Sequence, residues 1–415
     1  MGRVKYKNRL QKEVRYSTIA DMQLTNAEKF TLRQKISDYA KEIGFDLVGF
    51  SPAKIEEKYL VAFEDWLGNE REGSMEYMKK IEQRRDLTKI LPGAKSVIVF
   101  GMNYFNKQPA LKRGHGRVAR YAFGRDYHKV IGKKLKMVEK FIGEMCADFE
   151  HERSPVEFSS STPPSQICVP NVHTKSRGDI SHQELANKTA STSVREDSPR
   201  GGQSHTNAIT KSYVDTGPIL ERALAEQAGL GRIGKNSLLI TEKFGSWIFL
   251  SEIITTLDLN FATDAHIATP PSSRWSSPAE KSFNVCGNCN KCMTACPTGA
   301  IIAPGVVDAR LCISYLTIEN KEKIPPALAK IIKKTKRLYG CDVCQEVCPH
   351  NDARAKIATA PQDGLFTPIA GDSLDIKKIL TKTCTSEETF LKTFAGSPVM
   401  RAKRKGLQRT AKIFN

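Results

Sequence analysis

Eight of the 11 cysteines in this 415-residue sequence lie between residues 286 and 348. The first four follow the spacing Cys286-x2-Cys289-x2-Cys292-x3-Cys296, and Pro297 comes directly after the last one. With this spacing a chain supplies three thiolates to one four-iron, four-sulfur cluster and the fourth thiolate to a second cluster. Clustered cysteines in a reducing compartment indicate metal or redox chemistry rather than disulfides. The run therefore predicts a two-cluster electron relay.

A second run, Cys341-x2-Cys344-x3-Cys348-Pro349, lacks its first cysteine, and Cys312 is available to complete it. Two such runs exchange their fourth ligands, so the thiols divide into two sets. The first set is Cys286, Cys289, Cys292 and Cys348, and the second set is Cys296, Cys312, Cys341 and Cys344. Paired Cys-x2-Cys motifs also form structural zinc sites, which is the alternative interpretation of these residues.

Asp215 is the other residue whose type and position allow chemistry. It stands in Val214-Asp-Thr-Gly-Pro218, where a strand is expected to end and a helix to begin at the proline. A carboxylate at this point can serve in a reaction, and it can equally be a turn residue or the cap of the following helix. Spacing alone leaves both interpretations open.

The glycines of Gly229-x-Gly231-x-x-Gly234 match the dinucleotide-binding fingerprint. That fingerprint needs a strand before it, whereas residues 218–228 predict a helix, so the dinucleotide interpretation fails. Two interpretations remain. The glycines form a helix C-terminal turn that leads into a strand at residues 238–240, or their backbone approaches a phosphate or a large cofactor closely.

Hydrophobic periodicity indicates which elements position these residues. It predicts helices over residues 31–44 and 127–145 and through Phe63 and Trp66, with buried strands at 46–50 and 96–100. This alternation indicates an α/β or α+β domain. The expected order is a basic tail (1–26), an α/β domain (27–260), a polar linker (261–282), a ferredoxin-like domain (283–352) and a short basic helical segment (353–415).

Residues 151–210 interrupt the α/β pattern. They contain 17 serines and threonines and one aromatic residue, Phe158. So little apolar surface does not offset the entropy lost on ordering, and the sequence predicts a disordered insert.

The chain carries 64 lysines and arginines against 45 aspartates and glutamates, a net charge of +19. This excess favours a polyanionic partner such as nucleic acid or an anionic membrane surface. The N-terminus lacks the apolar stretch of a signal peptide, and no run of about 18 apolar residues occurs. We therefore expect a cytoplasmic protein.

Several segments together carry a family resemblance. They are Arg120-Tyr-Ala-Phe-Gly-Arg-Asp-Tyr-His-Lys129, Val214-Asp-Thr-Gly-Pro-Ile-Leu-Glu-Arg222, Ala228-Gly-Leu-Gly-Arg-Ile-Gly-Lys-Asn-Ser237, Gly245-Ser-Trp247, Cys312-Ile-Ser-Tyr-Leu-Thr-Ile-Glu319 and Tyr339-Gly-Cys-Asp342. In combination they resemble the epoxyqueuosine reductases, cobalamin-dependent iron-sulfur enzymes that perform the last step of queuosine synthesis on tRNA. The resemblance covers about residues 30–150 and 213–352.

This resemblance implies an α+β protein in which a three-layer corrinoid-binding α/β domain precedes the two-cluster domain. It implies a cobalamin beside the first cluster, reduced through the relay. Asp215 matches the proposed proton donor of the family, and desolvation near a corrinoid is expected to raise its pKa. The residues that match cofactor-binding positions are Arg84, Tyr121, Asp126, His128, Asp215, Ser237, Trp247 and Asp342. Residue type alone is also compatible with Tyr121 and Trp247 as core aromatics, Arg84 as a surface ion pair and Asp342 as a cluster-loop residue.

The implied activity is reduction of epoxyqueuosine to queuosine at the anticodon wobble position of tRNA. Electrons would come from a donor that the sequence does not identify, and we expect a monomer with no membrane partner. The first alternative is a corrinoid reductive dehalogenase, which shares the cofactors but usually carries a twin-arginine leader. The second is a ferredoxin-type electron-transfer module.

Overall fold

The computed structural model describes residues 23–153, 210–261, 285–352 and 368–415. The predicted tail, insert and linker therefore lie almost wholly outside the described residues. The larger sheet has the order β1-β2-β7-β4, and every neighbouring pair is antiparallel. Its strands are β1 (Leu47–Pro52), β2 (Ser96–Asn103), β7 (Ile248–Thr255) and β4 (Thr210–Tyr213). The strands predicted at 46–50 and 96–100 correspond to β1 and β2.

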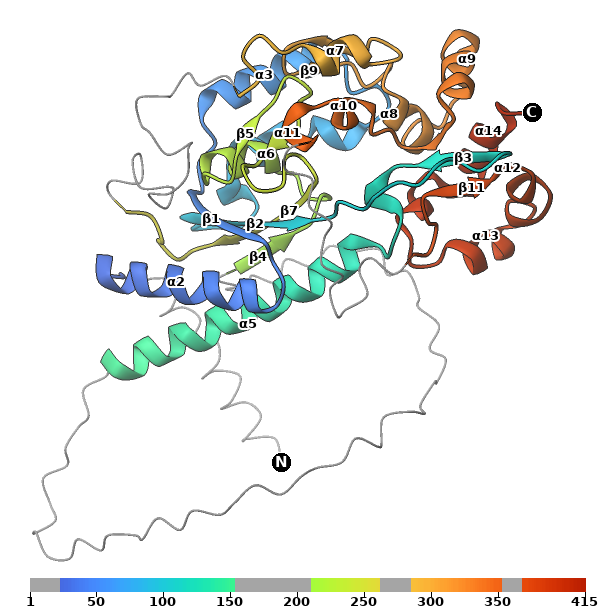
Figure 1. The fold of residues 1–415 in the computed structure, drawn as a ribbon. Helices are drawn as coiled ribbons and strands as arrows, with labels where there is room; N and C mark the ends of the chain where they lie inside the picture. Colours follow the sequence, from blue (N-terminus) through green and yellow to red (C-terminus); the bar gives the residue numbers. More distant parts are fainter. Residues whose placement is uncertain (1–22, 154–209, 262–284, 353–367) are drawn as a thin grey trace, which may run out of the picture.

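Helices cover both faces of this sheet. All eight residues of β2 are buried, and successive side chains point to opposite faces. Ile98 and Phe100 pack with residues of α2 (Asn26–Glu42) and α5 (Tyr127–Arg153). Val97 and Val99 pack with residues of α3 (Glu57–Gly68) and α6 (Glu221–Gln227). In Figure 1, α2 and α5 lie along one face of the sheet and α6 lies on the other.

The predicted helices correspond to α2, α3 and α5, and local sequence accounts for their ends. Helix α2 begins at a capping box, in which Thr25 and Glu28 each accept a hydrogen bond from the other's backbone N–H. Short elements fill the connections: α4 (Ile81–Arg85) lies between α3 and β2, and one 3-10 turn covers Arg120–Ala122 before α5. Asp126, directly before α5, accepts the N–H of His128 at 3.1 Å.

Helix α6 ends in the turn that the glycine spacing predicted. The N–H of Gly229 donates to the carbonyl of Glu226, and the N–H of Leu230 donates to that of Ala225. This Schellman pattern requires the positive φ of +76° that Gly229 adopts. The chain then forms a two-stranded ribbon of β5 (Arg232–Ile233) and β6 (Leu239–Ile240). The helix-terminus interpretation of these glycines is confirmed.

The cysteine-rich region consists of short elements. In chain order they are α7 (Lys291–Ala295), β8 (Ile301–Ala303), β9 (Val306–Val307), α8 (Ile313–Ile318), α9 (Pro326–Thr335), β10 (Arg337–Tyr339), α10 (Val343–Glu346) and α11 (Pro349–Asp352). Figure 1 shows α7, α10 and α11 on the α6 side of the large sheet. This arrangement brings Cys286 close to the loop that follows α6, where the backbone N–H of Lys235 contacts its sulfur.

The C-terminal region contains more than the predicted helices. It comprises β11 (Ser373–Asp375), α12 (Ile376–Lys378), a π-helical turn (Ile379–Thr383), α13 (Glu387–Phe394) and α14 (Lys403–Lys412). Strand β3 (His115–Val118) pairs in parallel with β10 and antiparallel with β11. This second sheet therefore takes one strand from each of the three predicted regions. Among the described residues, no helix is both long and apolar enough to cross a lipid bilayer.

Candidate active site

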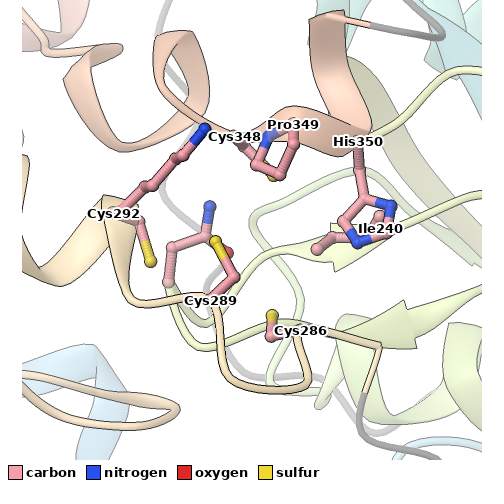
Figure 2. Close-up of a pocket in the computed structure, with 9 residues that line it drawn as sticks. Ile240, Cys286, Cys289, Cys292, Cys348, Pro349 and His350 are labelled. Atoms are coloured by element: carbon pink, nitrogen blue, oxygen red, sulfur yellow. The ribbon is translucent and has the colours of Figure 1, made fainter.

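The first predicted set of thiols lies around one pocket. Cys286, Cys289, Cys292 and Cys348 line it together with Asn236, Ile240, Lys291, Pro349 and His350. Figure 2 shows the four cysteine side chains around a shared space, with His350 and Ile240 at its edge. The sequence separates Cys348 from the other three by more than 50 residues, and the fold reunites them. Four soft sulfur donors in one place are the donor set of an iron-sulfur cluster.

The second predicted set is also brought together. Burial raises the pKa of Cys344 well above its usual value, and the nearby thiols of Cys341, Cys312 and Cys296 raise it further. Burial likewise raises the pKa of Cys341 to about 12, with Cys312 again among the nearby groups that raise it. Cys344 is thus within electrostatic range of the other three thiols, and four sulfur donors suit a second cluster.

Hydrogen bonds join the loop after Gly234, in the α/β domain, to the segment that carries Cys286. The backbone N–H of Lys235 donates to Cys286 Sγ at 3.3 Å, and Lys235 Nζ donates to the Gly287 carbonyl at 2.8 Å. Ser237 Oγ donates to the Gly305 carbonyl at 2.6 Å. Ser237, predicted to contact the corrinoid, thus has a contact between domains in this structure. An N–H donor to a ligand sulfur is one of the means by which a protein tunes a cluster potential.

Asp215 lies in the loop between β4 and α6 and does not cap the helix. The N-cap residue of α6 is Leu220, five positions further on. The Asp215 side chain is 57% exposed, and its Oδ2 accepts a hydrogen bond from the Tyr127 hydroxyl at 2.5 Å. His128 Nε2 lies 3.6 Å from the same oxygen. The carboxylate is therefore accessible while α5 holds it from one side.

His128 links two carboxylates. Its Nδ1 lies 2.8 Å from Asp126 Oδ1, and its Nε2 faces Asp215. Burial of the ring opposes its charge, but the hydrogen bonds to Asp126 and Asp215 outweigh burial and raise the pKa of His128 to about 9. The imidazole therefore carries a proton at neutral pH. Asp126 and His128, both predicted as cofactor contacts, are brought together with Asp215.

The expected rise in the pKa of Asp215 is wrong. Burial does act in that direction, but the hydrogen bonds from His128 and Tyr127 hold the pKa of Asp215 below its ordinary value. Within the His128–Asp215 pair, the proton therefore resides on the imidazole. Desolvation raises the pKa of a carboxyl, but the two donors on α5, which lie far from Asp215 in sequence, lower it by more.

Glu221 is a neighbour that sequence reasoning missed. Its Oε1 accepts the backbone N–H of Asp215 at 2.6 Å. Desolvation and the nearby charge of Asp215 raise the pKa of Glu221 to about 8. Glu221 lies within the Val214–Arg222 segment that carries the resemblance, but no spacing rule predicts a carboxylate that reaches back six residues to a backbone N–H.

Arg84, at the C-terminal end of α4, is only 3% exposed, so the surface ion-pair interpretation is wrong. Within the described residues, its Nε and Nη1 have no hydrogen-bond partner. Its Nη2 reaches the Tyr77 carbonyl at 3.4 Å, and the charge of Glu221 is near enough to affect its pKa. Burying a guanidinium whose N–H groups have no acceptor lowers the stability of the folded state, unless an acceptor pairs with them.

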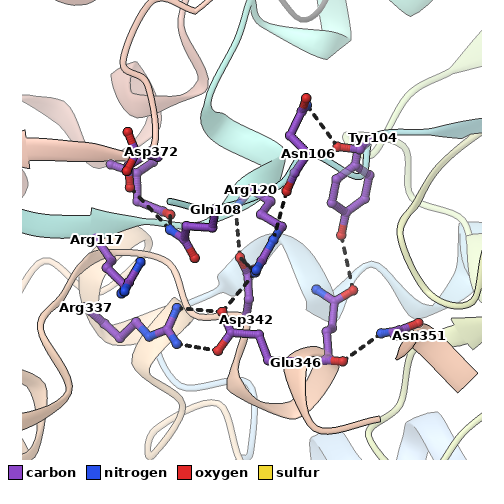
Figure 3. Close-up of polar contacts among 12 residues, drawn as sticks. Tyr104, Asn106, Gln108, Arg117, Arg120, Arg337, Asp342, Glu346, Asn351 and Asp372 are labelled. Carbon is purple, nitrogen blue, oxygen red and sulfur yellow. Dashed lines mark hydrogen bonds and ion pairs between the residues drawn. The ribbon is translucent and has the colours of Figure 1, made fainter. Parts of the chain in front are cut away.

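Two predicted cofactor residues lie in packed interior instead of at a free surface. Trp247 is 1% exposed, with Arg120 over its ring at 4.8 Å. Asp342 is 2% exposed, and its Oδ2 accepts the backbone N–H of Arg120 at 2.8 Å and Nη1 of the same residue at 3.2 Å. Figure 3 shows Arg120 between Asp342 and Glu346, with Arg337 on Glu346 as well. Burial at these two positions is compatible with the core-aromatic and cluster-loop interpretations, and contact of either residue with a cofactor stays a prediction.

Tyr121 lies at the edge of this group of residues. Its ring meets that of Tyr127 edge-on at 6.2 Å, and its hydroxyl lies 3.4 Å from that of Tyr339. Burial raises the pKa of Tyr121, with a contribution from the Asp215 charge. Tyr121 is therefore a partly buried neighbour of the Asp215 site.

Comparison with known proteins gives consistent results along the chain. A family model described as a 4Fe-4S double cluster binding domain matches residues 285–351. The model of epoxyqueuosine reductase QueG, DUF1730, matches residues 84–155. The epoxyqueuosine reductase of Gloeobacter violaceus is 33% identical over 380 residues, which are 91% of this chain and 94% of that protein. That of Escherichia coli is 32% identical over 89% of this chain and 77% of its own length.

Solved structures agree with the sequence relatives. A crystal structure of epoxyqueuosine reductase with a tRNA-Tyr epoxyqueuosine-modified stem loop aligns with a TM-score of 0.62 and 26% identity, over 93% of this chain and 81% of that one. The Bacillus subtilis enzyme, solved with a catalytic aspartate loop swung out of the active site, aligns with a TM-score of 0.63 and 25% identity, over the same shares. The two cysteine sets, the Asp215 site and relatives at more than 30% identity over nine-tenths of the chain lead to one conclusion: this chain belongs to the epoxyqueuosine reductase family.

Proposed function

We propose that this protein reduces epoxyqueuosine to queuosine in tRNA, with two four-iron, four-sulfur clusters and a cobalamin. The reaction converts the epoxide to an alkene and releases its oxygen as water, which consumes two electrons and two protons. The observation that carries the proposal is Asp215: an accessible carboxylate paired with a protonated imidazole, in the same fold as two sets of four cysteines. Family membership over 91% of the chain disfavours both alternatives, a dehalogenase and an isolated ferredoxin module.

The residues present suit the proposed cofactors. Each of the two cysteine sets supplies four thiols, and all four thiols of the first set line a single pocket. Arg84 keeps two buried guanidinium nitrogens without partners among the described residues, and these would meet the amide or phosphate oxygens of a corrinoid. Tyr121, Asp126 and His128 would line the corrinoid in the same three-layer domain. Cobalamin, when bound, supplies a strongly nucleophilic low-valent cobalt, which is chemistry that no side chain offers.

The protein's own part is proton transfer and placement. His128 Nε2 holds a proton beside Asp215 Oδ2, and Asp126 fixes the other ring nitrogen. Asp215, exposed at the loop, would pass this proton to the oxygen that leaves the epoxide, and His128 would restore it. Tyr127 donates to the same Asp215 oxygen and so keeps the carboxylate oriented. We propose Asp215 as the catalytic acid on this basis.

The tRNA partner suits the net charge of +19 and the exposed lysines of α9. A solved relative of this chain binds a modified tRNA stem loop. The same proposal implies a cytoplasmic monomer that receives electrons from an external donor, as expected from the sequence.

The test is mass spectrometry of nucleosides from the tRNA of cells that lack the gene. Epoxyqueuosine should accumulate, queuosine should disappear, and the wild-type gene should restore it. Unchanged queuosine in the deletion strain would overturn the proposal. Complementation with Asp215→Asn provides the matched comparison, because it tests the proposed acid in the same cells.

A further inference from the structure

The backbone of Asp215 adopts a conformation that residues with a side chain rarely take. Its φ is +58°, and the N–H of Thr216 donates to the carbonyl of Val214 at 2.6 Å. This hydrogen bond closes a three-residue γ-turn centred on Asp215, and such turns with a positive φ are strained. Contacts from outside the turn are therefore needed to keep it in place.

Glu221 supplies such a contact to the backbone. Its Oε1 accepts the N–H of Asp215 at 2.6 Å, across the loop that joins β4 to α6. Glu221 is the first residue of α6, and the next turn of that helix buries Ala223, Leu224 and Ala225. The acceptor oxygen is thus attached to an element that the core holds firmly.

The side chain of Asp215 is held separately, from α5. Tyr127 and His128 contact its Oδ2. One helix therefore positions the carboxylate and another positions the backbone that carries it. Without the α6 contact, the Asp215 N–H would lose its acceptor, and a strained turn with a 57% exposed side chain would keep the contacts of its carboxylate to α5.

We propose that Glu221 is a positioning residue: its hydrogen bond to the Asp215 N–H holds the turn against α6 and so sets the position of the carboxylate relative to the substrate. We call this hydrogen bond the latch. The inference rests on the proposed function of Asp215. Glu221 acts through an oxygen that accepts a backbone N–H, so that oxygen is required and the negative charge is not. Glu221→Gln keeps an oxygen at this position, whereas Glu221→Ala removes it.

Hydrogen exchange on the full-length holoenzyme tests the latch without the reaction. Peptides that cover residues 213–220 should exchange about tenfold faster in Glu221→Ala and near the wild-type rate in Glu221→Gln. Glu226→Ala is the matched control. Glu226 lies on the same helix, and its carboxylate accepts the N–H of Ile233 at 3.3 Å and the Tyr59 hydroxyl at 3.0 Å. Unchanged exchange in Glu221→Ala, or equal loosening in Glu226→Ala, would overturn the latch.

Steady-state kinetics on epoxyqueuosine-containing tRNA give the second readout. Glu221→Ala should lower kcat by about 10-fold to 100-fold, because a misplaced acid loses orientation, while KM stays within about twofold. Glu221→Gln should recover most of kcat. A Gln variant as slow as the Ala variant, or an effect on KM alone, would contradict the proposal. If every variant and the wild type failed to reduce the substrate while exchange changed as expected, the proposed function would fail and the latch would stand.

Discussion

The two cysteine sets and the Asp215 site are assembled over different sequence distances. The eight cysteines predicted as cluster ligands lie within a 63-residue stretch. Seven of them form two regularly spaced runs, Cys312 is available to complete the second run, and the fold brings the members of each predicted set near one another. The Asp215 site takes its contacts from α5 and from the start of α6, which the 154–209 segment separates in sequence. Regular spacing along the chain therefore indicates a ligand set, whereas the protonation state of a proposed catalytic group depends on residues that are distant in sequence.

The largest effect is expected in the cysteine region. If the two sets are separate, Cys312→Ala should lower iron from about eight to about four atoms per chain and abolish turnover, because one cluster keeps all its ligands. Iron and acid-labile sulfide analysis after anaerobic purification measures this. Cys384→Ala, a buried thiol outside both sets, is the control and should keep the full iron content. Loss of both clusters in Cys312→Ala would show that the two sets are not independent, and zinc in place of iron in the wild type would contradict the iron-sulfur assignment.

Asp215→Asn, in the Asp215 site, should show the next largest effect. Asn keeps the size of the side chain but does not deliver a proton, so turnover should fall by about two to four orders of magnitude. Iron content, cobalamin content and tRNA affinity should remain at wild-type values. Near-normal turnover would mean that the carboxylate has a structural role and that another group near His128 supplies the proton.

The pH dependence of turnover tests the role of His128. Its pKa of about 9 means that the imidazole is protonated at neutral pH and loses its proton as the pH rises through about 9, so wild-type turnover should fall above that value. His128→Asn should lower neutral turnover by about 10-fold to 100-fold and remove this inflection, because a supporting group contributes less than the acid itself. The inflection belongs to another group if it persists in the variant.

The same shift has a consequence for stability. A pKa raised from 6.5 to about 9 stabilises the folded state fully below about pH 6.5, and that stabilisation is lost as the pH rises through 9. Between these values the Tm of the wild type should therefore fall more than that of His128→Asn. Parallel curves for the two proteins would show that the Asp126 and Asp215 contacts contribute no folding free energy.

The smallest effect concerns tRNA docking next to the cysteine region. Lys330 and Lys334 are exposed one turn apart on α9. Replacing both by alanine should reduce the salt slope of tRNA binding, which is the slope of log K against the logarithm of the salt concentration, by about 1 to 2 in magnitude. Lys136→Ala with Lys140→Ala on α5, also exposed and one turn apart, is the matched control and should leave the slope unchanged. Equal slopes for both double variants would place the docking surface elsewhere. Arg337, although close in sequence to Lys334, is buried on Glu346 and is unsuited to this role.

Features that depend on local spacing could be predicted from the sequence. The cysteine grouping follows from the fixed span of ligand loops, and strands β1 and β2 and helices α2, α3 and α5 follow from apolar periodicity. The glycine turn after α6 follows in the same way, because a helix end requires a residue that accepts positive φ.

The chemical environment of these features depends on contacts between elements that are distant in sequence, so it required the folded structure. It placed Trp247 and Asp342 in the interior, brought β3, β10 and β11 into one sheet, and set His128 and Glu221 on opposite sides of Asp215. The pKa of a carboxyl reflects the balance between desolvation and donors supplied by other elements. No periodicity in the chain encodes which donors those are, so the direction of the Asp215 shift was accessible only once α5 and α6 were in place.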